Sequence, residues 1–300
     1  LWVVHRETRR VAVLQCTGGT GQSDREAELR ASYRVGAGGR GIALSPDGQT
    51  AWVDVGFEHA IARLEFRASD AEQEAALELR RPLGPTTLSS DALRGRRIFF
   101  DADDTHLTPS GVVTCSTCHP GGGEDGQTWF LHTPGVERKL RRTPPAWGAD
   151  LAPQHWDGGF TDVVELSAST IRELMEGDGL LVDLDALGAF MAETPPPPGA
   201  PRARAAAGRA VFENAGCDTC HPGGGGDGQL HSTIPTSADL DARLDEARTP
   251  VLFGVRARPP FFHDERATDL AAVLSTPGPH NVSGRTLAER DDLAEYLESL

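Results

Sequence analysis

The 300-residue sequence predicts a mainly α-helical protein, in which two tandem domains follow an N-terminal all-β segment. Three observations predict this fold class. Short runs of β-forming residues alternate with turn residues in the first quarter of the chain. Amphipathic helix patterns then occur in two copies of one order of landmarks, and a run of prolines separates the copies. We therefore expect four parts, at 1–84, 85–194, 195–199 and 200–300.

The first part has the pattern of short antiparallel strands. Ser45-Pro46-Asp47-Gly48 predicts a tight turn, because Pro sets φ and Gly allows a positive φ. Residues 41–53 resemble a strand pair of the YVTN-type or quinoprotein-like β-propellers. The resemblance implies a partial propeller of one to two blades, whose remainder would precede Leu1, and a small β-meander is the alternative. The β-type runs cover 2–4, 11–14, 41–44, 51–55 and 61–66.

The two later copies share their landmarks in the same order. Each copy opens with a helix that carries Gly-Arg and closes with an amphipathic helix. Between these helices come Cys-x-x-Cys-His, Pro-Gly-Gly-Gly, Asp-Gly-Gln, Arg-Thr-Pro and a loop with an aromatic residue or a histidine before aspartate. We expect the helices at 93–100, 184–191, 207–212 and 292–297. Because polyproline is stiff, the linker at 195–199 should hold the two domains at a fixed spacing.

Cys-x-x-Cys-His is the sequence that attaches c-type haem. Two thiols one helical turn apart can form thioether bonds to the haem vinyl groups, and the histidine that follows is the proximal iron ligand. A zinc half-site or a redox cysteine pair could also use Cys-x-x-Cys. A shared zinc ion would leave both histidines without a role, and a redox pair explains neither the histidines nor the duplication. The sequence therefore predicts two covalent c-type haems, bound through Cys115, Cys118, His119, Cys217, Cys220 and His221.

Composition and charge restrict the classes of partner. The net charge of −15 argues against binding nucleic acid or an anionic membrane surface. It could steer a basic redox partner towards the protein, although many acidic proteins are simply soluble. No apolar run approaches the length of a membrane span.

The sequence begins inside an apolar stretch and carries no signal peptide, so we expect the true N-terminus to be missing. Haem attachment to Cys-x-x-Cys-His takes place outside the bacterial cytoplasmic membrane. This predicts a periplasmic or otherwise exported protein. The fifth cysteine, Cys16, should be a small buried residue, or should pair with a cysteine outside this sequence.

The order of landmarks from residue 85 to Leu300 resembles the di-haem cytochrome c peroxidase family and its relatives that mature quinone cofactors in partner proteins. The resemblance depends on the two haem motifs, the two Arg-Thr-Pro turns, Trp156-Asp157-Gly158 and Phe261-Phe262-His263-Asp264. In that family one haem cleaves peroxide, and a second, low-spin haem supplies electrons. The resemblance implies that Trp156 assists electron transfer between the haems. Packing of Trp156 against a haem edge is the alternative.

The distal ligand of each iron decides the function, because a closed iron carries electrons and an open iron can bind peroxide. For the first haem, Met175 follows the Trp-Asp-Gly loop at a helix end and is the candidate ligand. Glu176 is its rival, since the family places an acid near this position to assist O–O cleavage. Met191 lies on the apolar face of the closing helix and is expected in the core.

The second copy contains no methionine, which excludes a His/Met haem there. His280 lies in the rigid loop at 277–281, where the resemblance places the distal ligand, and it would give a low-potential bis-His haem. His263 and Tyr296 are the alternatives. We expect His263 to bond backbone or a haem propionate and Tyr296 to pack.

Arg142 and Arg248 precede prolines at matched positions. They could bind haem propionates through bidentate hydrogen bonds, or they could be exposed or paired with carboxylates. The sequence thus predicts a di-haem cytochrome that transfers electrons to or from a small redox protein. The alternatives are a di-haem peroxidase that reduces hydrogen peroxide and a non-catalytic, redox-sensing scaffold.

Overall fold

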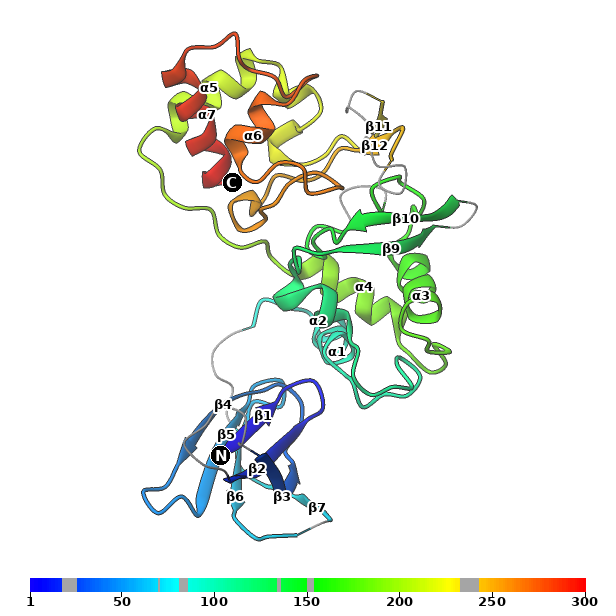
Figure 1. Cartoon of the computed structure of the whole chain (residues 1–300), viewed down its shortest axis with the longest axis vertical. Helices are drawn as coiled ribbons and strands as arrows, with labels where there is room; N and C mark the ends of the chain where they lie inside the picture. Colours follow the sequence, from blue (N-terminus) through cyan, green and yellow to red (C-terminus); the bar gives the residue numbers. More distant parts are fainter. Residues whose placement is uncertain (18–25, 70, 81–85, 134–135, 150–153, 233–242) are drawn as a thin grey trace. The chain divides into compact units, whose positions relative to one another are not determined.

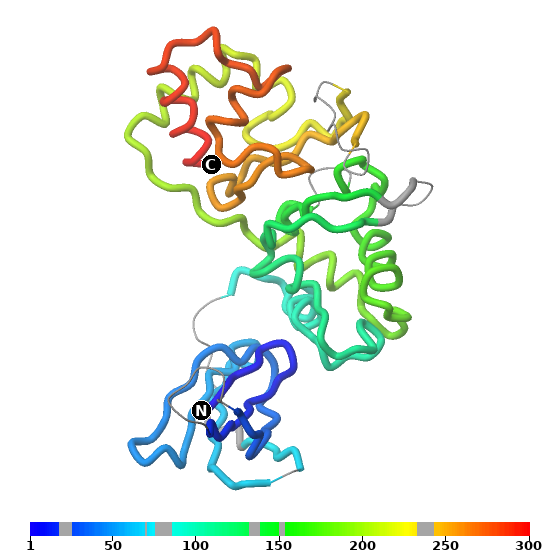
Figure 2. Tube along the Cα trace, viewed as in Figure 1, coloured from blue at the N-terminus to red at the C-terminus, as the bar shows by residue number. Residues whose placement is uncertain are grey.

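The computed structural model describes residues 1–17, 26–69, 71–80, 86–133, 136–149, 154–232 and 243–300. The chain forms two compact units. Unit 1 consists of Leu1–Cys115 and Met175–Leu187, and unit 2 of Ser116–Leu174 and Gly188–Leu300. Figure 1 labels the elements, and Figure 2 follows the Cα trace through each unit. The four predicted parts are a different partition of the chain and stay a prediction.

Unit 1 contains two four-stranded sheets with the orders β1-β2-β3-β7 and β4-β5-β6-β8 (Figure 1). Neighbouring strands are antiparallel except for β3 and β7, which are parallel. The strands are β1 (Trp2–His5), β2 (Arg10–Thr17), β3 (Glu26–Arg34), β4 (Gly39–Leu44), β5 (Thr50–Val55), β6 (Ala60–Glu65), β7 (Glu72–Glu74) and β8 (Ala76–Arg80).

The two sheets of unit 1 share one apolar core. Every second residue of a strand points to this core, as the buried Val11 and Val13 of β2 and the buried Val53 and Val55 of β5 illustrate. Side chains from both sheets belong to a single cluster. Strands β7 and β8 are separated by Ala75 alone and pair with different sheets, so this short segment joins the two sheets.

Two parts of the predicted fold class are wrong. Helix accounts for 29% of the structure and strand for 22%, so the chain is not mainly α-helical. Strand pairs that the sequence did not predict lie between the haem motifs and the Arg-Thr-Pro turns, at Thr128–Thr133 with Val136–Arg142 and at Leu230–His231 with Ala247–Arg248. No β-propeller is found among the described residues. The N-terminal strands instead close around their own shared core, because β7 and β8 pair one with each sheet.

The sequence predicts a turn at 45–48 and a buried Cys16 in the β-segment. The turn before β5 is confirmed: Gly48 has φ +70°, and Ser45 N–H donates to the Thr50 carbonyl at 2.8 Å. The expected burial of Cys16 is wrong, because its side chain is exposed near the end of β2. An exposed cysteine on a strand end contributes nothing to the core.

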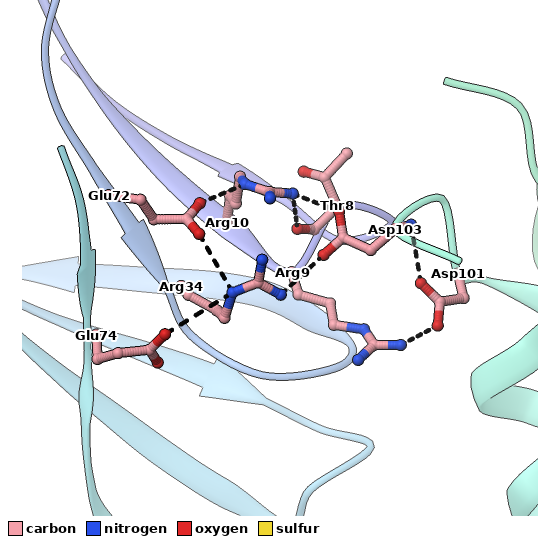
Figure 3. A network of polar contacts seen from close by, with 8 residues as sticks. All are labelled: Thr8, Arg9, Arg10, Arg34, Glu72, Glu74, Asp101 and Asp103. Carbon is pink, nitrogen blue, oxygen red and sulfur yellow. Dashed lines mark hydrogen bonds and ion pairs between the residues drawn. The ribbon is translucent and has the colours of Figure 1, made fainter. Parts of the chain in front are cut away.

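Salt bridges tie the segment after helix α1 (Ser90–Phe99) to the first sheet of unit 1 (Figure 3). Asp103 accepts from Arg10 and from Arg34, the latter at 3.1 Å, and Glu72 of β7 bridges the same two arginines. Asp101 accepts from Arg9 in the same way. The network thus joins strands and the segment that leads towards the first haem motif within one unit.

The segment that carries Met175 is held by a close backbone approach within unit 1. A Cβ atom at Gly177 would lie 2.3 Å from the carbonyl oxygen of Leu107, so only glycine fits there. His106 Nδ1 lies 2.8 Å from an Asp178 carboxylate oxygen, and Gly179 N–H donates to the His106 carbonyl at 2.9 Å. Met175 itself is 6% exposed.

Unit 2 combines helices with small strand pairs (Figure 1). Helices α2 (Cys115–Cys118) and α4 (Leu184–Glu193) cross the division between the units. The elements within unit 2 are η2 (Pro120–Gly122), β9 (Thr128–Thr133), β10 (Val136–Arg142), α3 (Val163–Glu173), α5 (Ala205–Asn214), η3 (Cys217–Thr219), η4 (Pro222–Gly224), β11 (Leu230–His231), β12 (Ala247–Arg248), η5 (Val255–Ala257), α6 (Leu270–Ser275) and α7 (Leu287–Ser299).

The predicted helices near the ends of both copies are present as α1, α4, α5 and α7. Helices α5 and α7 pack closely, because Gly208 lets the α5 backbone approach the carbonyl of Asp292. Val211, Phe212, Leu293 and Leu297 are buried at this contact. No helix in the described ranges is long and apolar enough to cross a membrane.

Candidate functional site

The two haem motifs have the same local geometry. Each is followed by a short 3-10 turn in which Gly121 and Gly223 have φ +63° and +61°. His119 Nδ1 lies 3.1 Å from the Gly123 carbonyl oxygen, and His221 Nδ1 lies 3.3 Å from that of Gly225. A carbonyl can only accept, so Nδ1 carries the proton and Nε2 is left with a lone pair for a metal. This is the tautomer that a histidine needs in order to bind a metal through Nε2.

A cavity in unit 2 contains the second motif. Its empty space is ≈ 870 Å³, open solvent at its mouth included. Apolar side chains of α5, α6, α7 and the segment 250–262 line most of it, and the polar lining consists of a few residues. These polar lining residues are Arg142, Trp156, Cys217, His221, Arg258 and His280.

The pKa values of both histidines of this cavity are lowered. Burial, followed by the charge of His280, lowers the pKa of His221 to about 4. Burial, followed by Arg266, lowers the pKa of His280. Both imidazoles are therefore neutral at pH 7, which is the form that binds a metal. His280 follows α6, and its ring lies 5.8 Å from that of Phe262.

The two alternatives to His280 lie elsewhere in unit 2. His263 is 1% exposed, and its ring is 6.1 Å from that of Trp156. Tyr296 packs on Phe212 of α5 with ring centroids 5.3 Å apart. Neither residue lines the cavity as the described residues define it. The identity of the distal ligand stays a prediction, and the geometry favours His280.

Burial also perturbs the side chains of the first motif. Burial lowers the pKa of His119 and raises the pKa of the Cys118 thiol to about 11. Met175 is buried in unit 1, whereas His119 belongs to unit 2, so their pairing on one iron stays a prediction. Glu176 is exposed and has φ +61°, and its catalytic role also stays a prediction.

A buried ion cluster lies beside the second cavity. Glu124 forms ion pairs with Arg142 and, at 2.7 Å, with Arg258, and all three side chains are at most 6% exposed. Arg142 also donates to the Arg258 carbonyl at 2.7 Å. We call Arg142, Glu124 and Arg258 the buried triad. Arg142 and Arg258 both line the cavity, so the triad forms part of its wall.

Trp156 and Arg248 connect the two copies of the repeat. Trp156 donates its indole N–H to the Arg142 carbonyl at 2.8 Å, and its own carbonyl accepts from Arg248 N–H at 2.9 Å. The reciprocal bond runs from Arg142 N–H to the His263 carbonyl at 2.9 Å. Trp156 and His263 therefore occupy matched positions, one from each copy.

The arginines fit a cofactor that brings carboxylates. Burial and the neighbouring Arg258 lower the pKa of Arg248 to about 10. Nε of Arg142 is buried and has no hydrogen-bond partner among the described residues. A buried donor without a partner is costly, and haem propionates would supply acceptors at this wall. The residues of the second cavity thus fit a haem in their iron ligands, apolar lining and donors.

Glu124 and Arg258 were not among the site residues predicted from the sequence. Glu124 follows His119 by five residues, and the matched residue after His221 is Gly226. A Cβ at Gly226 would lie 2.4 Å from the Thr249 carbonyl oxygen, so the second copy has no room for the same acid. This single difference between two otherwise similar loops was the available signal for Glu124. Arg258 follows a 3-10 turn and carries no comparable signal.

One further group of metal-ligating side chains is present in the described ranges. Ligand atoms of Cys220, Asp227 and His231 lie within 4.8 Å of one another, and His231 Nε2 is 2.7 Å from Asp227. In the first copy Trp129 donates to the matched Asp125 at 2.8 Å. The group shares Cys220 with the second haem motif, so it belongs to that site.

No protein-family model matches the chain, and no curated protein matches its sequence. Among solved structures, a chain of hydrazine synthase from Kuenenia stuttgartiensis is similar with a TM-score of 0.59 and 19% identity, covering 72% of this chain and 89% of that chain. A variant of a diheme peroxidase from Burkholderia thailandensis gives a TM-score of 0.49 and 16% identity, covering 70% and 85%. The second likeness is too weak for an argument. The first shows that this chain shares the fold of the hydrazine synthase chain.

Proposed function

We propose that the chain is a di-haem c-type cytochrome that transfers electrons between two covalently held haems. The observation that carries the proposal is the second cavity, which brings Cys217, His221 and His280 to one apolar space. When bound, haem supplies an iron that cycles between ferric and ferrous states. This agrees with the sequence resemblance to the di-haem cytochrome c peroxidase family.

The cysteines and histidines of both motifs would hold the cofactors. Cys115 and Cys118 would attach the first haem and Cys217 and Cys220 the second. The Nδ1–H bonds of both proximal histidines to backbone carbonyls fix ring orientation and raise the basicity of Nε2. In the second cavity His280 would be a further ligand to the haem iron, and an iron held by two histidines favours electron transfer over binding of peroxide.

Trp156 lies where the two copies of the repeat meet in unit 2. It lines the second cavity and bonds to the backbone of Arg142 and Arg248. We propose that it lies on the electron path between the haems, and that Arg142 and Arg248 bind propionates. Electron exchange with a small redox protein and export to the periplasm complete the proposal.

Absorption spectra of the purified holoprotein in both redox states test the proposal. We expect two haems per chain and a low-spin second haem that does not react with hydrogen peroxide. In His280→Gly the second haem should become high-spin, whereas Tyr296→Phe should leave the spectrum unchanged as the control. Peroxide turnover by the partly reduced parent would instead favour a peroxidase, and an unaltered His280→Gly spectrum would exclude His280 as ligand.

A further inference from the structure

We propose that Glu124 is a positioning residue that sets the reduction potential of the second haem. It would do so by holding Arg142 and Arg258 at the wall of the second cavity. This inference rests on the proposed function, because it requires haem in that cavity. It assigns to a side chain of the first haem loop an effect on the second haem.

The contacts of the triad support this positioning role. The Glu124 side chain is 2% exposed and joins both guanidinium groups, of which Arg258 Nε lies 2.7 Å from Glu124 Oε1. Arg258 also donates to the Val251 carbonyl, and Arg142 donates to the Arg258 carbonyl. Each guanidinium is thus held at two points, one of which is Glu124. Without that carboxylate, both long side chains would regain rotamer freedom.

The charges of this region are unequal. Arg142, Arg248 and Arg258 are buried, and Glu124 is the acid that both stabilises Arg142 and offsets the buried charge of Arg248. Charges in such a poorly solvated region act over longer distances than charges in water. Removal of the Glu124 charge leaves more positive charge beside the haem, which favours the ferrous state and raises the potential.

The position of Glu124 in the chain ties it to both haem motifs. The adjacent Gly123 provides the carbonyl that accepts from His119 Nδ1, so the same loop orients the first proximal ligand. The Glu124 side chain, however, contacts Arg142 and Arg258, which line the second cavity. The second copy cannot return this contact, because Gly226 has no room for a side chain. The effect is therefore expected at one haem only.

Spectroelectrochemical titration of Glu124→Gln in the full-length holoprotein tests the inference. We expect the reduction equilibrium of the bis-His haem to shift about tenfold towards the ferrous form, or about 59 mV for a one-electron couple. Arg258→Gln should shift it in the opposite direction, and the double variant should return towards the parent. Glu213→Gln is the matched control, because it removes the same charge from an exposed ion pair on α5.

An unchanged potential in a Glu124→Gln variant that retains both haems overturns the inference. If Glu124→Gln does not incorporate haem, the Arg258→Gln variant tests the inference instead. An unchanged potential in that variant also overturns the inference. A parent protein without covalent haem, or without a low-spin second haem, would instead contradict the proposed function. The two failures are therefore distinguishable in one set of samples.

Discussion

Met175 is the residue that we predict to close the first haem. Its buried side chain follows α3, and the approach of Gly177 to the Leu107 carbonyl fixes the segment that carries it. A thioether is a weak, soft ligand that stabilises ferrous iron. A closed first haem would make the protein an electron carrier at both irons.

Met175→Ala should open the first haem, lower its potential and convert its spectrum to high-spin. Loss of a buried methionine side chain should also cost about 2–5 kcal/mol of stability. Spectra of the reduced and oxidised variant, with denaturant unfolding of the same samples, check both effects. Met191→Ala is the control, because it removes the other methionine of the chain and should leave the spectrum unaltered. A low-spin Met175→Ala protein would exclude Met175 as ligand.

Single residues differ in how far the sequence reveals them. The haem motifs are local, so five neighbouring residues are enough to predict a cofactor, and the two His–carbonyl contacts fit that prediction. The buried triad is not local, because Glu124 and Arg258 are 134 residues apart. Nothing in either segment alone indicates the partner, so the pairing appears only when the chain is folded.

Helices α5 and α7 show how packing of elements supports the second site. Both contribute side chains to the cavity, namely Phe212 from α5 and Leu293 and Leu297 from α7. Their separation is set by Gly208, where a Cβ would lie 1.9 Å from the Asp292 carbonyl oxygen. A larger residue must push the helices apart, and the cavity wall moves with them.

Gly208→Ala should therefore destabilise the protein by about 1–3 kcal/mol, the usual cost of overpacking, and should reduce occupancy of the second haem. Gly284→Ala is a matched control, since no heavy atom lies within 4 Å of a Cβ placed there. Denaturant unfolding and the ratio of haem to protein measure the two effects. Equal stability of both variants would contradict close packing at Gly208.

Elements were predictable where their signals were local. The four amphipathic helices and the Pro-Asp-Gly turn follow from periodicity and turn chemistry, and the structure confirms them. The hairpin of β9 and β10 was missed, although Thr128–Thr133 contains β-forming residues. β-Propensity depends on context, so the residue types alone do not reveal the pairing of this segment with β10.

At the scale of the whole chain, the expectation of a mainly helical protein was wrong because sheet formation is non-local. Ala75 alone separates β7 from β8, and the residues of these strands do not show that each joins a different sheet. The prediction that residues 41–53 form a strand pair is confirmed by the antiparallel pairing of β4 with β5. It did not determine how the sheets associate.

The distribution of apolar cores predicts how the molecule responds to loss of haem. The core of unit 1 is formed by its own strands, from Val11 to Leu64. In unit 2 much of the apolar cluster formed by α5, α6 and α7 lines a cavity. A protein interior tolerates such empty apolar space poorly, so haem should stabilise unit 2 far more than the sheets of unit 1.

A full-length variant in which the four motif cysteines are replaced by alanine should separate the two responses. Amide hydrogen exchange should lose protection in α5 and α7 by at least about tenfold, equivalent to about 1.4 kcal/mol. Strands β2, β5 and β6 should keep the protection that they have in the holoprotein, because none of the described residues of their core lines the second cavity. Cys16→Ala provides the control for a cysteine replacement outside the motifs. Parallel loss of protection in the strands and the helices would show that the N-terminal sheets depend on haem for their stability.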